Sequence, residues 1–497
     1  MPPSYNLYDR QALRLIESSA SHALGGDAFE LMRRAGQAAW RYLLQHWPDA
    51  RCIVVVCGPG NNGGDGYVLA RLAHESGRAV NVVHLPEQAP RSELALRACR
   101  EHASSGGRVE LFQGELRNAD LIVDALFGIG MTRAPDADAA ALIVAINRHA
   151  APVLSLDVPS GIDSDSGRIF PHAVNADRTL QFIAAHRGLQ TGAALDHVGK
   201  LAHVTLDIPQ EVLDGVQPGA RLLDTRHLSA WLPPRPNDSH KGRFGHVLCV
   251  GGDAGMGGAI ALCAEAALRT GAGLVSIATH PSNAAAVLSR RPEAMVLGVD
   301  SSHDAQHAMD AATVIAIGPG LGLSAWAQAL LSSVMAAAKP LVIDADALNL
   351  LAKSPLALND AILTPHPGET ARLLDLSAQE IQNDRFAAAD ALAKRFNCTV
   401  VLKGAGTIIS SPGEIPCVIA AGNPGMASGG MGDVLTGVIA ALRAQGLEAF
   451  DAACCGALLH ALAGDAAAAA GGQRGMIASD LFAHLRTLAN PEAVQLP

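Results

Sequence analysis

Short runs of aliphatic and β-branched residues, each followed by a segment long enough for a helix, constrain the fold of this chain most strongly. Strands that are apolar along their whole length are typical of a parallel sheet covered by helices on both faces. The alternation therefore predicts an α/β protein built from two successive units. The predicted strands are residues 53–56, 80–85, 121–126 and 153–156 in the first unit, and residues 247–250, 274–278, 314–317, 341–343, 362–363 and 400–402 in the second.

A proline-rich segment separates the two series of strands. It follows neither the helical nor the strand periodicity, which is typical of a domain boundary. A chain of 497 residues also exceeds the size that one hydrophobic core usually supports. We therefore predict a first domain at residues 1–217, a linker at 218–237 and a second domain at 238–497.

Composition and charge exclude several classes of partner. The net charge of −10 and the aromatic content of 4% argue against binding to nucleic acid or to anionic membranes. Charged residues within 9–17 interrupt the place of a secretory signal, and prolines and glycines break the uncharged stretch 415–432. Nine cysteines without a CxxC pair are typical of reduced thiols, and Cys454 and Cys455 lie in an apolar helical pattern expected in the core. We expect a soluble, cytoplasmic protein.

The first unit contains a strand that runs into a glycine-rich segment. Five glycines lie within residues 58–66, and a helical pattern follows at 67–74. The free N–H groups and the dipole at such a helix start attract anions. A simple turn needs only one or two glycines. This segment is therefore interpreted as a loop that binds a phosphate-bearing ligand.

Two aspartates end further strands of the first unit. Asp124 and Asp157 each follow an apolar run, and ligands of open α/β sheets bind where the strands end. One of them could instead cap the next segment. Because both accompany the motif at Asn61 and Asn62, we expect three strand ends to converge on one crevice.

These motifs together resemble the NAD(P)H-hydrate epimerase family over about residues 5–215. The ordered motifs are LMRRAG at 31–36, NNGGDG at 61–66, VDALFGIG at 123–130 and DVPSG at 157–161. The resemblance implies a Rossmann-like three-layer α/β/α domain, with Asp157 as the acid/base group at C6 of the hydrated nicotinamide. It implies that a potassium ion is held by Asn62, Asp124 and Ser160, oxygen ligands that suit a hard cation. The implied substrate-binding residues are Asn61, Asn62, Gly63, Gly64, Asp65, Gly128, Ile129, Gly130, Met131, Thr132, Arg133, Ala134 and Asp157.

The second unit carries its most informative motif at residues 422–433. Several glycines there precede Asp433, and apolar residues after it repeat at helical spacing. A helix start of this kind forms an anion hole, and an adjacent aspartate can act as base toward a hydroxyl that approaches a phosphoryl group. Asp433 could instead be a helix N-cap. No Walker A sequence occurs, which excludes a P-loop mechanism.

Further motifs follow the other strands of the second unit. They are GDAGMGGA at 252–259, GPGLG at 318–322, DADALN at 344–349, TPHPGE at 364–369 and KGAGT at 403–407. Lys403 can approach an anion. His366 lies between two prolines at a strand end and is expected to face a cleft.

With GxGD at 430–433, these motifs resemble the NAD(P)H-hydrate dehydratases of the ribokinase-like superfamily, over about residues 225–490. The resemblance implies a ribokinase-like α/β domain that phosphorylates the C6 hydroxyl of the S hydrate before elimination. The phosphoryl donor is ADP in bacterial members and ATP in eukaryotic ones, with magnesium bridging the phosphates. The implied substrate contacts are Ala259, Gly322, His366 and Asp433, and the implied ADP or AMP contacts are Lys403, Gly404, Ala405, Gly406, Thr407 and Gly432.

Both resemblances together predict a bifunctional enzyme that repairs hydrated NADH and NADPH. The epimerase would let both hydrate epimers drain through a dehydratase that accepts one. Two alternatives remain: a thiazole or pyrimidine kinase fused to a regulatory domain, and a first domain that serves as a binding scaffold. We expect a homo-oligomer, because members of the family often assemble through both domains.

Overall fold

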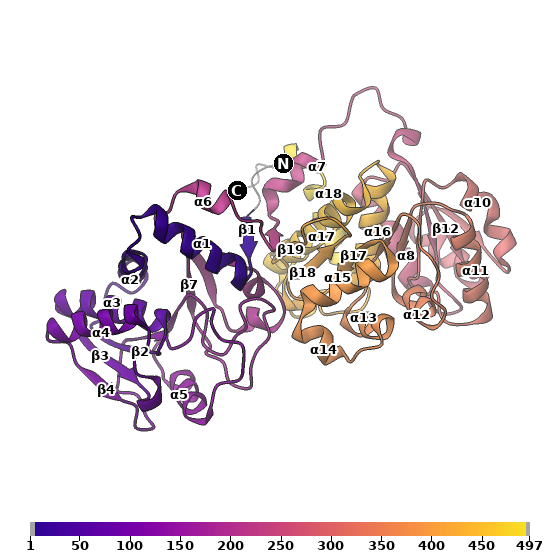
Figure 1. Cartoon of the computed structure of the whole chain (residues 1–497). Coiled ribbons are helices and arrows are strands. Elements are labelled where there is room, and N and C mark those ends of the chain that lie inside the picture. Colours follow the sequence, from indigo (N-terminus) through magenta and orange to yellow (C-terminus); the bar gives the residue numbers. More distant parts are fainter. Residues whose placement is uncertain (1–4, 494–497) are drawn as a thin grey trace. The chain divides into compact units, whose positions relative to one another are not determined.

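The computed structural model describes residues 5–493, so residues 1–4 and 494–497, at the ends of the two expected domains, lie outside it. The chain divides into two compact units, a first unit of residues 6–220 and a second unit from residue 221 onward (Figure 1). Part of the expected linker 218–237 is folded. It contains β10 (Ala220–Leu222) and α7 (Leu228–Trp231), and Leu228 and Trp231 are buried in the core of the second unit. Apolar side chains that precede Pro233 and Pro234 therefore belong to the hydrophobic core of the second unit.

The first unit contains a parallel sheet in the order β4-β3-β2-β5-β6-β7-β9. This order reverses between β2 and β5, as in Rossmann-like folds. All four strands predicted for this unit form. The strands are β2 (Cys52–Cys57), β3 (Ala79–His84), β4 (Val109–Leu111), β5 (Leu121–Ala125), β6 (Val153–Leu156), β7 (Arg178–Phe182) and β9 (Lys200–Val204).

Helices cover both faces of this sheet. Ile53 and Val55 of β2 face the cluster that includes α1 (Arg10–Ala23), α2 (Ala28–His46), α3 (Asn61–Glu75) and α4 (Glu93–Ser104). Val54 and Val56 face the opposite cluster with α5 (Ala137–Arg148). Alternate side chains of one apolar strand therefore enter two cores. The predicted three-layer α/β/α architecture is confirmed.

The second unit contains a longer sheet in the order β13-β12-β11-β14-β15-β16-β17-β18-β19-β10. Neighbouring strands are parallel from β13 to β17, whereas β18 runs antiparallel to both β17 and β19. The six predicted strands of this unit all form. The strands are β11 (His246–Val250), β12 (Leu274–Thr279), β13 (Met295–Gly298), β14 (Val314–Ile317), β15 (Leu341–Ile343), β16 (Ala361–Leu363), β17 (Thr399–Leu402), β18 (Thr407–Ser410) and β19 (Cys417–Ile419).

This sheet is also buried on both faces. Val247 and Cys249 of β11 face α8, α16 and α17, whereas Leu248 and Val250 face α10, α11, α12 and α15. These helices are α8 (Gly257–Thr270), α10 (Gln306–Ala311), α11 (Ala325–Ala336), α12 (Ala345–Lys353), α15 (Arg385–Phe396), α16 (Met431–Ala444) and α17 (Ala449–Gly471).

Helix α17 (Ala449–Gly471) is unusually long and apolar. Among the described residues it is the one helix long and apolar enough to cross a bilayer, yet 72% of its most apolar window is buried inside the protein. Cys454 and Cys455 lie in its middle and are buried, as predicted. Its apolar character is that of a helix packed in a core.

We predict that Gly437→Ala destabilises the second unit. A Cβ at Gly437 would lie 2.0 Å from the backbone oxygen of Cys263, where α16 packs on α8, so the helices must separate. Overpacking of this kind costs about 1–3 kcal/mol of unfolding free energy, measurable by urea titration. The matched control is Gly471→Ala in α17, where no described atom lies within 4 Å of the added methyl. The control should gain roughly 0.5–1 kcal/mol of stability; equal stability of the two variants would contradict this packing.

Candidate active sites

The first candidate site is a cavity of about 930 Å³ at the carboxyl ends of β2, β5 and β6. It lies where the strand order reverses, the usual ligand position in this type of sheet. Its volume is in the range of small-molecule and cofactor sites. Residues 128–136 form one part of its wall, and Asn62, Asp65, Asp157 and His186 also line it.

The glycine-rich segment of the first unit is the first turn of a helix. Helix α3 begins at Asn61, whereas we expected a loop up to residue 66. Added Cβ atoms would lie 2.0 Å from the Gly58 oxygen at Gly63, and 2.3 Å from the Met32 side chain at Gly64. Close packing therefore accounts for these two glycines, neither of which lines the cavity. Asn61, Asn62 and Asp65 do line it.

Asp124 is buried at the end of β5 and is surrounded by donors. Its carboxylate accepts hydrogen bonds from the Ser160 hydroxyl at 2.6 Å, the Ser160 N–H at 2.9 Å and the Ser155 hydroxyl at 2.9 Å. Burial raises the pKa of Asp124, and these bonds oppose that rise. Asp124 therefore joins β5 to β6 and to the turn at Ser160, behind the cavity wall.

The buried side chain of Asn62 has no hydrogen-bond partner among the described residues. This holds for both its amide oxygen and its amide nitrogen. Buried polar groups are normally satisfied, so this amide is suited to a bound group. Asn62, Asp124 and Ser160 carry side-chain oxygens, the kind of ligand that hard cations prefer.

Asp157 follows β6 and points its carboxylate at the cavity. Its φ of 66° lies in the left-handed region, a strained conformation that recurs at functional sites. Oδ1 lies 2.7 Å from Nε2 of His186, and Oδ2 accepts the N–H of Ile129 at 3.2 Å. His186 belongs to β8 (Ala185–His186) and is buried. The sequence motifs did not indicate His186, although this histidine comes after β7 in the chain as Asp157 comes after β6.

Two further carboxyl groups line the same cavity. Burial, followed by the charges of Asp157 and Glu17, raises the pKa of Asp65 well above its ordinary value. Glu17 reaches the cavity from α1. The cavity thus combines an aspartate held by two donors with a carboxyl group whose charge is disfavoured. A carboxyl group whose pKa is raised by burial is suited to an acid role.

The second candidate site lies where β15 and β17 meet the start of α16. Asp344 follows β15, is buried, and accepts Nζ of Lys403 at 2.7 Å and the Thr436 hydroxyl at 2.8 Å. A Cβ on Gly432 would lie 3.2 Å from Nζ of Lys403, so the glycine lets the helix backbone approach the cation. The structure therefore brings Lys403 and Gly432 together, and Asp344, to which we assigned no role, positions the lysine.

Asp433 lies within the first turn of α16. The N-cap is Gly430, with φ 92°, so the alternative interpretation of Asp433 as the N-cap is wrong. Burial, with the charge of Asp344, raises the pKa of Asp433 to about 7, while Lys403 opposes the rise. A carboxyl group with this pKa is suited to exchange a proton near neutral pH.

The remaining predicted substrate contacts lie at two helix starts and on one loop. Ala259 lies in the first turn of α8, and the Gly322 N–H donates to Asp346 at 2.8 Å. His366 is the N-cap of α13 (Pro367–Leu374): its Nδ1 accepts the Gly368 N–H at 2.9 Å, and half of its side chain is exposed. One ring nitrogen of His366 is therefore used structurally.

Arg385 holds the turn that joins β17 to β18 through hydrogen bonds to its backbone. This turn contains the predicted nucleotide contacts from Lys403 to Thr407, and the Thr407 hydroxyl donates to the Gly404 oxygen at 3.0 Å. Arg385 is buried and donates to the backbone oxygens of Leu402 and Lys403 at 3.2 and 3.3 Å. The sequence did not indicate Arg385, because a helical pattern does not distinguish a buried arginine from one exposed to solvent.

Comparison with known proteins matches both units. Residues 28–188 match the family model described as YjeF-related protein N-terminus, and residues 247–487 match the model described as NAD(P)H-hydrate dehydratase. A ribokinase-like superfamily protein from Enterococcus faecalis is 35% identical with a TM-score of 0.52, covering 55% of this chain and 96% of that chain. The predicted ribokinase-like fold of the second unit is confirmed.

Curated relatives match the chain over almost its whole length. A bifunctional NAD(P)H-hydrate repair enzyme of Coxiella burnetii is 46% identical over 98% of this chain and 99% of its own length. One of Escherichia coli is 44% identical over 97% of this chain and 93% of its own length. Two α/β units, each with an aspartate-bearing site at its strand ends, define a two-domain enzyme of nucleotide metabolism. The chain belongs to the family of bifunctional NAD(P)H-hydrate repair enzymes.

We predict that the charges of Lys403 and Asp344 control the pKa of Asp433 in opposite directions. Lys403→Met removes a cation that favours the carboxylate, so the pKa of Asp433 should rise above about 7. Asp344→Asn removes an anion that disfavours the carboxylate, so the pKa should fall. Carbon NMR of labelled aspartate carboxyl groups measures both shifts. Shifts in the same direction for the two variants would contradict this electrostatic arrangement.

Proposed function

We propose that the first unit interconverts the R and S hydrates of NADH and NADPH, and that the second unit dehydrates the S hydrate at the expense of ADP. The observation that carries this proposal is the full-length similarity to bifunctional NAD(P)H-hydrate repair enzymes. The two sites support it, because each places an aspartate beside groups able to bind an anionic dinucleotide.

In the epimerase site, Asp157 is the acid/base group that assists loss and return at C6 of the hydrated ring. His186 and the Ile129 N–H fix its two oxygens. Asp65, whose pKa is raised by burial, supplies a second carboxyl group to the same cavity. Asn61, Asn62 and the wall at residues 128–134 contact the dinucleotide, with the start of α3 directed at its phosphates.

A potassium ion in this unit would be held by Asn62, Asp124 and Ser160. Its charge would favour the binding of the dinucleotide phosphates near the start of α3. The unpaired Asn62 oxygen supports this assignment, because a cation would satisfy it.

In the dehydratase site, Asp433 takes the proton of the C6 hydroxyl as that oxygen attacks the β-phosphorus of ADP. The phosphorus–oxygen bond to AMP breaks as the new bond forms. Lys403 and the N–H groups at the start of α16 stabilise the charge that develops, and magnesium would neutralise the phosphates. Phosphate then leaves C6 with a proton from C5, which restores the dihydronicotinamide ring.

The residues assigned to substrate and nucleotide in the second unit surround this reaction. Ala259, Gly322 and His366 contact the hydrate beside Asp433, and the turn from Lys403 to Thr407 holds ADP with Gly432. A kinase with a regulatory domain would share only the second unit, and a scaffold would not need a strained, hydrogen-bonded Asp157. We further propose that the enzyme acts in the cytoplasm as a homo-oligomer, without nucleic acid or membrane partners.

Two substitutions should separate the activities. Asn tolerates the left-handed conformation of Asp157, so Asp157→Asn should fold and reduce epimerisation by about 10²–10⁴-fold. Dehydration of pure S hydrate should stay unchanged in this variant. Asp433→Asn should give the reverse result. Recovery of reduced-nicotinamide absorbance measures dehydration, and chromatography of the two epimers measures epimerisation. Wild-type rates in both assays for either variant would contradict the proposed division.

Cation dependence tests the potassium assignment. Epimerisation should fall in buffer with an organic cation and recover with added potassium, because Asn62, Asp124 and Ser160 then regain their ion. Asn62→Leu should remove the response to potassium. Dehydration by the same preparations is the internal control and should not change in Asn62→Leu. Epimerisation that is indifferent to potassium in the wild-type protein would refute the site.

A further inference from the structure

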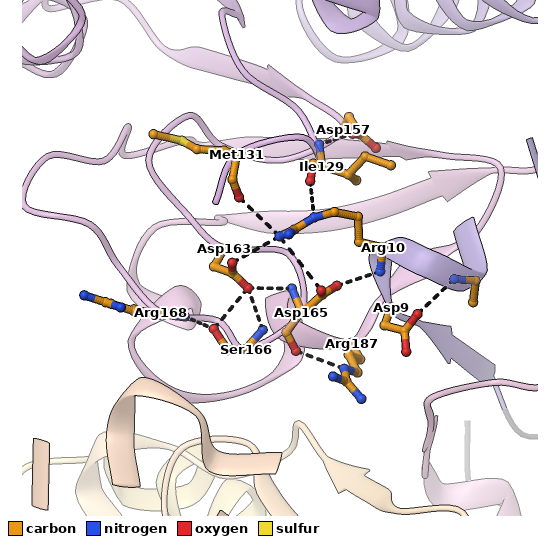
Figure 2. Close-up of polar contacts among 11 residues, drawn as sticks. Asp9, Arg10, Ile129, Met131, Asp157, Asp163, Asp165, Ser166, Arg168 and Arg187 are labelled. Carbon is orange, nitrogen blue, oxygen red and sulfur yellow. Dashed lines mark hydrogen bonds and ion pairs between the residues drawn. The ribbon is translucent and has the colours of Figure 1, made fainter. Parts of the chain in front are cut away.

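Arg10 reaches from the start of α1 to the cavity wall of the first unit. Figure 2 shows its guanidinium between the backbone of the wall segment and the turn at residues 163–166. Nε donates to the backbone oxygen of Ile129, and Nη2 donates to that of Met131 at 3.2 Å. Both acceptors belong to the segment that lines the epimerase cavity.

The same arginine is anchored on its other side. Nη2 also donates to Oδ2 of Asp163 at 3.1 Å, and the Arg10 backbone N–H donates to Oδ1 of Asp165 at 2.6 Å. Asp163 is itself fixed, because its Oδ1 accepts the N–H groups of Asp165 and Ser166, each at 2.9 Å. The Arg10 side chain is 14% exposed. The guanidinium is therefore held in one position between the turn and the wall.

Ile129 connects this arrangement to the proposed acid/base group. Its backbone oxygen accepts Arg10, and its N–H donates to Oδ2 of Asp157 at 3.2 Å (Figure 2). Glycines flank Ile129 on both sides: a Cβ on Gly128 would lie 2.8 Å from Oδ2 of Asp157, whereas a Cβ on Gly130 would meet no packed neighbour within 4 Å among the described residues. A segment with two glycines has wide backbone freedom and needs external contacts to keep one conformation.

An ion pair between α1 and the turn would not by itself require these contacts. Asp163 occupies only Nη2, yet Nε is directed at the wall and Nη2 is shared with Met131. Arginine presents its donors in a rigid fork, so fixing the guanidinium also fixes the two carbonyl oxygens that it binds.

We propose that Arg10 is a positioning residue of the epimerase site, which fixes the segment from Ile129 to Met131 so that the Ile129 N–H stays on Asp157. This inference rests on the proposed epimerase function. Arg10 does not touch the reacting atoms; it acts through the backbone of Ile129.

Kinetics of the full-length protein test the proposal. Arg10→Gln should lower the kcat of epimerisation by about 10–100-fold, since a displacement near 1 Å at a catalytic group can cost that much. Arg10→Lys should recover part of the rate, because an ammonium can still pair with Asp163 but cannot bind both carbonyl oxygens. Dehydration of S hydrate should be unchanged in both variants.

The matched control is Arg71→Gln. Arg71 lies in α3 of the same unit, has a similarly buried side chain, pairs with Glu75 at 3.2 Å, and does not line the cavity. Epimerisation by Arg71→Gln should keep its wild-type kcat. Equal loss of kcat in Arg10→Gln and Arg71→Gln, with the same fall in Tm, would overturn the proposal in favour of a general structural role. A wild-type kcat in Arg10→Gln would overturn it directly.

Hydrogen exchange separates this proposal from the proposed function. The Ile129 amide should exchange at least tenfold faster in Arg10→Gln than in the wild-type protein, since its hydrogen bond to Asp157 is no longer maintained. Unchanged exchange would refute the positioning role whatever the reaction is. Faster exchange in a protein that does not epimerise hydrates would instead leave Arg10 in its role and refute the epimerase assignment.

Discussion

Covering a parallel sheet on both faces determines where this protein can place polar chemistry. Adjacent residues of one strand enter opposite cores, as Val55 and Val56 do in β2, so a strand buried on both faces leaves little room for charged groups. The carboxyl ends of the strands are the positions left for such groups. Both units follow this rule with different strand orders, and each gathers aspartates at one edge of its sheet.

Each candidate site contains a buried aspartate at a strand end and a second aspartate to which we assign the acid/base role. Asp124 and Asp344 are both buried at strand ends, and in both cases hydroxyl or charged donors occupy their carboxylates. A buried charge needs such partners to be tolerated. Asp157 follows β6 directly and lines the cavity of the first unit, whereas Asp433 lies in the first turn of α16. Asp124 and Asp344 hold the surrounding donors in place, and Asp157 and Asp433 are the residues to which we assign the proton transfers.

The apolar runs were sufficient to predict every strand that they marked, because a strand buried on both faces has a distinctive composition. Weaker strands such as β4 and β9 lie at the edges of the sheet, where partial burial leaves no continuous apolar run. The motifs placed Asp157 and Lys403 at strand ends, where the structure has them. They did not indicate His186, Arg10 or Arg385, since these residues act through contacts with segments far away in sequence.

The glycine-rich segment at residues 58–66 contains a shorter loop than expected, because α3 begins at Asn61. Gly63 and Gly64 pack against Gly58 and Met32, which no local pattern reveals. The binding role of the segment stays a prediction. The position of Asn61 and Asn62 at the cavity did not depend on the length of the loop.

The early start of α3 has a consequence for the thermodynamics of ligand capture. Asn61 and Asn62 occupy a helix turn in which Gly63 packs on Gly58 and Gly64 packs on Met32, so a bound dinucleotide would not have to order a loose loop there. The conformational entropy lost on association is then small on this side of the cavity. On the opposite side, Ile129 lies outside any helix and is held instead by its hydrogen bonds to Arg10 and Asp157. Both walls of the cavity are therefore held in place before a ligand enters.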